Sequence, residues 1–505
     1  MTGMTGLLNA YQPAHERPTL LARVTSNAAI GLFAVVAGVA AIISGMSLGL
    51  GGEDKRMVVL PLVAAAGLAL AALALTRFAA FTLLLLGARA SLDLFKLSGA
   101  SAGNTATNSA AVRGMDPSSL LGVLFLVASC LWLIAQYSSG RRLRGSALRT
   151  ALIAFVAAGA VSVIGAHPPQ AAMLEVLRIL SVAMMFVVLQ QLITSRDMLM
   201  KTLYAAYASL IFPLGYTVFG LLAGSPASEV KGSFVRLTGP FAQSNTFARY
   251  LAFMIVFGVA LYPTVSRRLR MMLLPLLGLS TVFLLLTLTR SAILSAVVGI
   301  VAVALVQGRK RLLVGFAVSA LLAAALVPGL GTRFATLSAG EQVVGGPETG
   351  NSLEWRLNYW TEVLPLANSN PVTGIGLNMT QYQTDAAKQP HNDFIRAYVE
   401  TGVLGLGAYL AVHFCLIRNA ILAIQRSARG SLEHGVAAGA LGCALVFLLA
   451  SLAANMMSNV VSLWYLVAFS AAASYVALRG QPDAFGLEGQ RDTRPERAPV
   501  EATRG

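Results

Sequence analysis

Residues 171–193 read AAMLEVLRILSVAMMFVVLQQLI, an apolar run in which Glu175 and Arg178 are the only charged residues. A helix of this length crosses the ~30 Å hydrocarbon core of a bilayer. Because such runs recur, the sequence predicts an all-α, polytopic integral membrane protein with about 12–14 transmembrane helices and one large extracytoplasmic loop. The apolar runs lie near 28–50, 57–76, 78–95, 118–138, 147–166, 171–193, 199–224, 244–264, 271–288, 291–307, 311–328, 402–425, 435–454 and 459–478.

The composition supports a membrane protein and argues against a nucleic-acid-binding protein. Of the 505 residues, 56% are hydrophobic and only 11% are charged, with a mean hydropathy of +0.71. A soluble domain carries about 25% charged residues. The net charge is +16, but the Lys and Arg residues are scattered between apolar runs, so we expect membrane lipids and no nucleic acid as partners. Cys130, Cys415 and Cys443 lie inside apolar runs, which indicates neither a disulfide framework nor a metal cluster.

The basic residues predict the orientation of the chain. Loops rich in Lys and Arg face the cytoplasm, and the alternation of such loops predicts that both termini are cytoplasmic. In a bacterium this places the protein in the inner membrane, with the other loops facing the periplasm. The basic clusters lie at 141–144, 196–201, 267–270, 309–311 and 418–429. The segments expected outside are 96–117, 165–170, 225–243, 329–390 and 455–458.

One long external loop stands apart from the helices, because it contains no apolar span. It includes a predicted helix from Asn351 to Leu366, capped by Asn351 and carrying Trp355, Tyr359 and Trp360, which suit a membrane interface. The predicted organisation is a cytoplasmic N-terminal tail at 1–27, a transmembrane bundle at 28–328, the external loop at 329–401, C-terminal transmembrane helices at 402–478 and a disordered cytoplasmic tail at 479–505.

Several arginines occur at the predicted outer level, where the positive-inside rule does not account for them. Charges inside or at the rim of membrane spans are costly and are candidate functional residues. A planar guanidinium binds phosphate oxygens in pairs, and helix N-termini add donors for an anion. The sequence therefore predicts a diphosphate receptor facing outward. Its candidate residues are Arg89, Arg178, Arg236, Asn245, Arg249, Arg290, Arg356 and His391.

Most of these residues also have a simpler explanation. Arg89 is spaced to pair with Asp93 at (i, i+4). Arg178 is spaced to pair with Glu175, one helical turn earlier. Arg236 and Arg249 are placed to extend toward the interface from a span end, Arg356 to lie on a solvated helix face, and His391 to be an ordinary residue at a helix start.

Four motifs resemble the O-antigen ligase and polymerase family. They occur in the family's order over roughly residues 170–460, whereas the long polar ends and the glycine-rich 340–350 segment depart from it. The motifs are Arg236-Leu237-Thr238-Gly239-Pro240-Phe241 followed by Ser244-Asn245; Thr287-Leu288-Thr289-Arg290-Ser291; Arg356 to Trp360 with Asn370-Pro371 and Gly374-Ile375-Gly376; and His391-Asn392 with Gly402 and Gly405.

The resemblance implies a membrane glycosyltransferase. Members transfer a glycan from a polyprenyl diphosphate carrier to an acceptor hydroxyl outside the cytoplasm, without an obligatory metal or another cofactor. The acceptor is the lipid A core for a ligase and another glycan for a polymerase. The implied catalytic residues are His391 and Arg290. The implied substrate-binding residues are Arg178, Arg236, Asn245, Arg249, Arg356, Asn392 and Arg89.

The residue chemistry agrees with this assignment. A histidine has an unperturbed pKa near ~6.5, so we expect His391 to act as the general base for the acceptor hydroxyl. We expect Arg178, Arg249 and Arg290 to neutralise the departing diphosphate, in a single displacement that inverts the anomeric configuration. The sequence shows no dense acidic cluster on the outer side, so we expect no Mg²⁺ site.

Two alternatives remain open at the level of sequence. A transporter or lipid flippase also uses arginines in spans, but such folds favour internal repeats and sites at the bilayer midplane, and no clear repeat is present. Within the enzyme class, the choice between ligase and polymerase depends on the fold of the external loop. A structural assembly subunit is disfavoured by the convergence of the arginines with His391.

Overall fold

The computed structural model describes residues 55–94, 117–231, 234–309, 311 and 352–478. The predictions for the two tails, for the runs at 28–50 and 311–328, and for the 340–350 segment lie outside these residues. The chain divides into two compact units, residues 1–84 and 85–505. The described part of the first unit contains α2 (Lys55–Thr76) and most of α3 (Phe78–Ala88).

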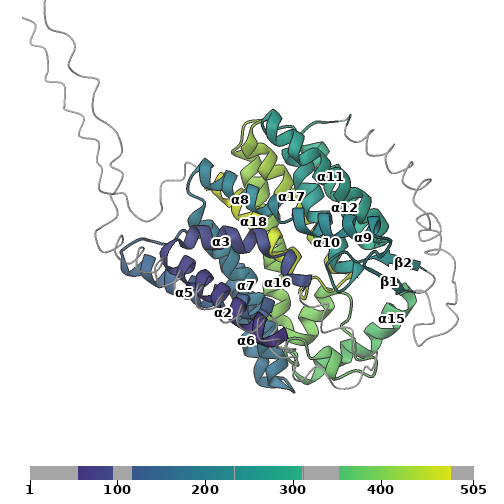
Figure 1. Cartoon of the computed structure of the whole chain (residues 1–505). Coiled ribbons are helices and arrows are strands. Elements are labelled where there is room, and N and C mark those ends of the chain that lie inside the picture. Colours follow the sequence, from purple (N-terminus) through teal and green to yellow (C-terminus); the bar gives the residue numbers. More distant parts are fainter. Residues whose placement is uncertain (1–54, 95–116, 232–233, 310, 312–351, 479–505) are drawn as a thin grey trace, which may run out of the picture. The chain divides into compact units, whose positions relative to one another are not determined.

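The second unit is built almost entirely of helices (Figure 1). Its elements follow the apolar runs of the sequence. They are η1 (Ser91–Asp93), α5 (Pro117–Ser138), α6 (Ala147–Ser162), η2 (Val163–Gly165), α7 (Pro169–Leu192), α8 (Arg196–Ala208), α9 (Ile211–Leu222), β1 (Ser228–Lys231), β2 (Phe234–Leu237), α10 (Ser244–Leu261), α11 (Arg267–Leu286), α12 (Arg290–Val306), α15 (Ser352–Val363), η3 (Leu364–Ser369), η4 (Thr380–Tyr382), α16 (Asp393–Gln425), α17 (Leu432–Ala453) and α18 (Val460–Ala477).

The predicted all-α polytopic membrane fold is confirmed. Within the described residues, nine helices are long and apolar enough to cross a membrane, and three shorter apolar helices accompany them. The external loop's predicted helix is present as α15, followed by η3. The small β1–β2 hairpin, which pairs Glu229 with Arg236, was not predicted from the sequence.

One apolar run does not form the single span that the sequence predicts, and another forms it with a turn inside. The run at 78–95 gives only the 11-residue α3, which ends at Ala88, and Arg89 and Asp93 then form a buried ion pair. The run at 199–224 gives α8 and α9 with a turn at 209–210 between them, and the two together still make one candidate span, Arg196–Leu222. Apolar composition is the same on both sides of such a turn, so hydropathy does not reveal it.

Helices α10, α17 and α18 form the centre of the second unit. Nearly every residue of α10 and α18 is buried. Glycines allow the helices to approach closely: a Cβ at Gly439 would lie 2.7 Å from the Phe257 ring, and one at Gly442 would lie 2.6 Å from Val256. In lipid the hydrophobic effect does not drive helices together, so the close packing that small residues allow contributes to their association. The Phe257 and Phe469 rings stack with centroids 3.8 Å apart.

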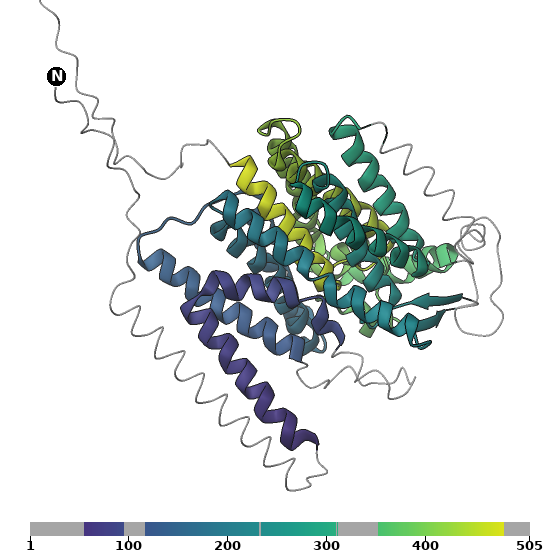
Figure 2. The ribbon, with the colours of Figure 1, turned by 45° about the horizontal axis from the view of Figure 1, so that its top comes forward.

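The segments of interest meet at one end of this bundle. Helices α9 and α11 end there, and α10, α12, α16 and α18 begin there. Contacts between their connecting segments establish this arrangement: Arg236 binds Asn245 and Thr289, and Asp393 binds the backbone at Met456. We call it the hairpin end, after β1 and β2, which lie beside α15 in both views (Figures 1 and 2). The sequence predicts that this end faces outward.

Candidate active site

Arg236 is the central residue of one half of the candidate site. It lies on β2, is only 3% exposed, and uses several donors of its guanidinium. Its Nε donates to the Thr287 carbonyl at 2.9 Å, and one terminal nitrogen donates to Asn245 Oδ1 at 2.8 Å and to Thr289 Oγ1 at 2.7 Å. The other terminal nitrogen lies 3.8 Å from Glu229 on the paired strand. Arg236 thus links the hairpin to the starts of α10 and α12.

The turn between α11 and α12 explains how its polar atoms come to face Arg236. Leu288 has a positive φ of 49°, a conformation that is uncommon for a residue with a Cβ. The chain reverses there, so the Thr287 carbonyl and the Thr289 hydroxyl point to the same guanidinium. Arg290 then begins α12, where the N-terminal end of the helix favours an anion.

Four arginines from four elements gather around this point. Arg290 is close enough to Arg236 and Arg356 to lower the pKa of both, although burial is the larger cause in each case. Glu229 partly offsets the effect on the Arg236 pKa. Arg249 interacts electrostatically with Arg236 and Arg356. Mutual repulsion among one buried and three half-buried cations makes this a place where a bound anion is stabilising.

Arg249 has a hydrogen-bond donor, its Nε, that no group of the described residues accepts. It follows Asn245 by four residues, so both side chains lie on one face of α10. Among the described residues, its buried Nε has no hydrogen-bond partner. A buried unpaired donor is costly, and an anion among the arginines would satisfy it.

His391 is the central residue of the other half. It has a positive φ of 56° immediately before α16. Its backbone N–H donates to Asn455 Oδ1 at 2.7 Å, and Asn455 Nδ2 lies 3.1 Å from its ring Nδ1. Its ring also meets Trp355 edge-on, with centroids 6.0 Å apart. Trp355 precedes Arg356 in the sequence, so this contact places His391 beside the helix that carries one of the arginines.

Helix α15 is held in place by aromatic side chains. Trp360 Nε1 donates to the Pro390 carbonyl at 2.8 Å, next to His391. Tyr359 is buried, which raises its pKa, and its hydroxyl bonds to Thr384 Oγ1 at 2.7 Å and to the Lys388 carbonyl. The interfacial aromatics predicted from the sequence therefore anchor the helix to the loop that ends at His391.

A buried ion network supports the start of α16. Arg396 is fully buried between Glu175 at 3.0 Å and Glu400 at 2.8 Å. Glu400 also accepts hydrogen bonds from the backbone N–H groups of Asn378 and Thr380, which fixes the external loop to the helix. These charges are paired and hydrogen-bonded, as buried charges must be. They are placed to support the site rather than to bind substrate.

Three predicted residues have partners of their own within the protein. Arg89 pairs with Asp93 at 3.2 Å and lies over the Trp464 ring. Arg178 pairs with Glu175 at 3.0 Å, with 54% of its side chain exposed. Asn392 is the N-cap of α16, where its Oδ1 accepts the N–H groups of the second and third following residues. Arg236, Asn245, Arg249, Arg290, Arg356 and His391 are the ones that the structure brings together.

Sequence reasoning missed several residues of this region. Asn455 lies in the predicted external segment 455–458, but an asparagine between two spans carries no distinct signal. Glu229 was also missed, because its contact with Arg236 depends on the unpredicted hairpin, and Thr289 was quoted only as part of a motif. Arg396 and Glu400 form an (i, i+4) pair of charges at the start of a span, a signal that was available. Among the described residues, no cluster of three or more His, Cys, Asp or Glu side chains is suited to a metal ion.

The helices define a polytopic membrane protein, and its arginines and His391 gather at one end of the bundle. Residues 275–410 match the family model described as O-Antigen ligase. The match supports assignment to the O-antigen ligase and polymerase family, and it confirms the resemblance seen in the motifs. The family points to a membrane glycosyltransferase-like enzyme with lipid-linked glycan substrates. The matched segment includes Arg290, Arg356 and His391. No curated protein matches the chain.

Proposed function

We propose that the protein is a membrane glycosyltransferase of the O-antigen ligase type. It transfers a glycan from a polyprenyl diphosphate carrier to an acceptor hydroxyl on the extracytoplasmic side, with inversion and without a metal ion. The convergence of four arginines from β2, α10, α12 and α15 beside His391 is the observation that carries this proposal. A diphosphate supplies the negative charge that this arrangement lacks.

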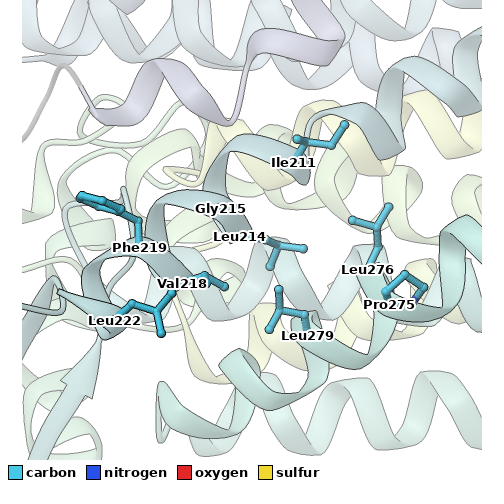
Figure 3. Close-up of a pocket in the computed structure, with 9 residues that line it drawn as sticks. All are labelled: Ile211, Leu214, Gly215, Val218, Phe219, Leu222, Pro275, Leu276 and Leu279. Atoms are coloured by element: carbon cyan, nitrogen blue, oxygen red, sulfur yellow. The ribbon is translucent and has the colours of Figure 1, made fainter. Parts of the chain in front are cut away.

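An apolar groove supports a lipid-linked donor (Figure 3). It has a volume of about 390 Å³ and lies between α9 and α11, where its lining includes Leu214, Phe219 and Leu279. Helix α9 leads directly into the hairpin that carries Arg236, and α11 leads into the turn before Arg290. A polyprenyl diphosphate has the same order of parts, an apolar chain followed by an anion.

The proposed reaction is a single displacement at the anomeric carbon. The acceptor oxygen bonds to this carbon while the bond from the carbon to the phosphate oxygen breaks, and the diphosphate leaves with the electron pair. Negative charge grows on the diphosphate during this step. We expect Arg249, Arg290 and Arg356 to stabilise this charge, and donors positioned before the reaction are worth about 10²–10³-fold in rate each.

The acceptor distinguishes a ligase from a polymerase. We propose the lipid A core as acceptor, which is the acceptor of a ligase, although the family match covers ligases and polymerases alike. A polymerase of the same family, which joins two glycans, is the second candidate. Both use the same donor and the same arginines, so only the product separates them.

The test uses purified protein in detergent, a polyprenyl-diphosphate-linked glycan, EDTA and two acceptor pools. One pool is lipid A core and the other is additional lipid-linked repeat units. We expect transfer to the core, undiminished by EDTA and lost in Arg290→Ala and His391→Ala at normal protein levels. Arg268→Ala is the control, because Arg268 is exposed at the opposite end of α11.

Each of the other results has a clear meaning. A ladder of longer lipid-linked chains assigns the polymerase activity. If neither product forms while the protein still binds or moves the carrier lipid, the enzyme proposal fails and the transporter alternative replaces it.

A further inference from the structure

Asn455 contacts His391 twice, and the two contacts together determine which ring nitrogen carries the proton. The backbone N–H of His391 can only donate, so the Asn455 atom 2.7 Å from it is the amide oxygen. The amide nitrogen therefore faces ring Nδ1 at 3.1 Å. An amide nitrogen only donates, so Nδ1 must accept. In a neutral imidazole the proton then sits on Nε2.

We propose that Asn455 is a positioning residue that holds His391 in the Nε2–H tautomer, so that Nε2 donates a hydrogen bond to an oxygen of the donor's diphosphate. This inference rests on the proposed function. It assigns His391 a role different from the general base expected from the sequence, because a protonated Nε2 has no lone pair for the acceptor's proton. That proton passes instead to an oxygen of the departing diphosphate, whose second ionisation near pH ~6 makes it a suitable acceptor.

The segment that carries Asn455 is firmly attached to the start of α16. Asp393 Oδ2 accepts the backbone N–H groups of Met456 at 2.8 Å and Met457 at 3.2 Å. Ser458 Oγ accepts from Arg396 at 2.7 Å. The backbone beside Asn455 is thus held in place, and the bond from the His391 N–H to Oδ1 orients the amide. The tautomer is therefore set by the fold rather than by the substrate.

The surroundings of His391 also favour a neutral imidazole ring that donates a hydrogen bond through Nε2. The charged residues nearest to the contacts of His391 are Arg356, which follows Trp355 on α15, Lys388, which lies over the Trp355 ring, and Asp393 with Arg396 in the first turn of α16. The same elements also carry Glu354, Glu362, Asp385, Glu400 and Arg418. The Asp393 carboxylate is directed to the 456–457 backbone and to Tyr409. A second proton on the ring would point Nδ1–H at the donating Asn455 amide, which is repulsive.

The variant Asn455→Asp reverses the polarity of one contact and keeps the other. A carboxylate still accepts the His391 backbone N–H, but it can only accept from Nδ1. The neutral ring then carries its proton on Nδ1, and Nε2 donates only when the ring is fully protonated. We expect activity to fall about 100-fold as the pH rises through the imidazole titration, whereas wild-type activity does not fall over that range.

The matched control is Asn459→Asp, four residues further along the same segment. Asn459 caps α18 by accepting the Ser462 N–H, and aspartate is an equally good cap. We expect this variant to keep the wild-type pH profile. If Asn455→Asp is instead more active at high pH, in parallel with a wild-type rate that rises with pH, His391 is a general base and the proposal is wrong.

A measurement that needs no activity separates this inference from the proposed function. Protein labelled with ¹⁵N-histidine shows which ring nitrogen is protonated, and His391→Gln identifies the His391 signals. We expect an unprotonated Nδ1 and a protonated Nε2 at pH 8, exchanged in Asn455→Asp. A protonated Nδ1 in the wild type overturns the inference even if glycan transfer is observed. The expected tautomer without any transfer leaves the geometry correct and the proposed function wrong.

Discussion

At the scale of single residues, the site depends on one guanidinium that binds three segments. Arg236 contacts the Thr287 carbonyl, Thr289 and Asn245, all from segments that begin or end helices. Its planar fork is what allows one side chain to reach them together, and a lysine has a single donor point. Arg236 is therefore better placed to shape the arginine cluster than to contact the substrate with all its donors.

Replacing Arg236 with lysine tests this property. We expect Arg236→Lys to keep the positive charge but to reduce kcat/KM by about 100-fold, because Asn245 and the turn before α12 lose their common partner. The measurement is glycan transfer per amount of folded protein. Arg268→Lys, at the opposite end of α11, should retain wild-type activity. An unchanged rate in Arg236→Lys would show that charge alone is sufficient at this position.

Asn392 provides a second test at this scale. Its Oδ1 caps α16, so Asn392→Ala should lower the free energy of unfolding by about 1 kcal/mol, whereas Asn392→Asp retains the cap. The readouts are thermal unfolding in detergent and activity per folded protein. If Asn392→Asp is stable but inactive, the amide contacts the substrate, as the family resemblance implies. If it is active, the role of Asn392 is structural.

The residues of the site were predicted from the sequence only in part. Arginines in or beside spans are costly, and this physical rule selected Arg236, Arg249 and Arg290 as candidates. The same rule also selected Arg89 and Arg178, which pair with nearby carboxylates in the structure. Sequence separation does not show whether a charge faces a helical neighbour or a shared cluster. Asn455 was missed because its importance depends on contacts across the fold.

At the scale of elements, α16 is the helix that connects the site to the bundle. It begins beside His391 and contains a break at Gly402, where φ is 65° and ψ is −167°. A Cβ at Gly402 would lie 2.2 Å from the Val372 backbone. The break thus lets the external loop reach the helix, and the glycine is required for both its backbone angle and its lack of a side chain.

Alanine substitutions along α16 should separate these effects. We expect Gly402→Ala to destabilise the protein by about 4 kcal/mol or more, because it strains the backbone and displaces the loop at Val372. Gly407→Ala is the matched control, since a Cβ at Gly407 meets nothing within 4 Å, and alanine favours a helix by up to about 1 kcal/mol. Folded yield and thermal unfolding give the comparison. Equal stability of the two variants would contradict a tight contact at Gly402.

The elements themselves were mostly predictable. Long apolar runs gave nearly every helix, because spanning a bilayer requires a satisfied backbone over a fixed length. The capped aromatic segment at 351–366 gave α15. Hydropathy did not give the β1–β2 hairpin, the turn that separates α8 from α9, or the early end of α3. These features arise from local turns and buried ion pairs, which have no distinct period in the sequence.

At the scale of the whole molecule, the predicted orientation has a direct test. The loop at 139–146 is expected in the cytoplasm and the loop at 225–243 outside. In a Cys130→Ser background, a membrane-impermeant maleimide applied to intact spheroplasts should label Ser225→Cys but not Ser139→Cys. Both serines are exposed. Lysed membranes should label both. The reverse pattern in intact spheroplasts would place the arginine cluster on the cytoplasmic side.

The pairing of His391 with Asn455 has a consequence for how the protein is made. The two residues are separated by 64 positions, and α16 and α17 lie between them. At about 5–20 residues per second, a ribosome needs roughly 3–13 s to synthesise this interval. During that time the histidine is already in the growing chain, but the amide that fixes its ring does not yet exist. If the proposed role of Asn455 is correct, the His391 ring takes its fixed orientation only after α17 and the segment that follows it have been synthesised.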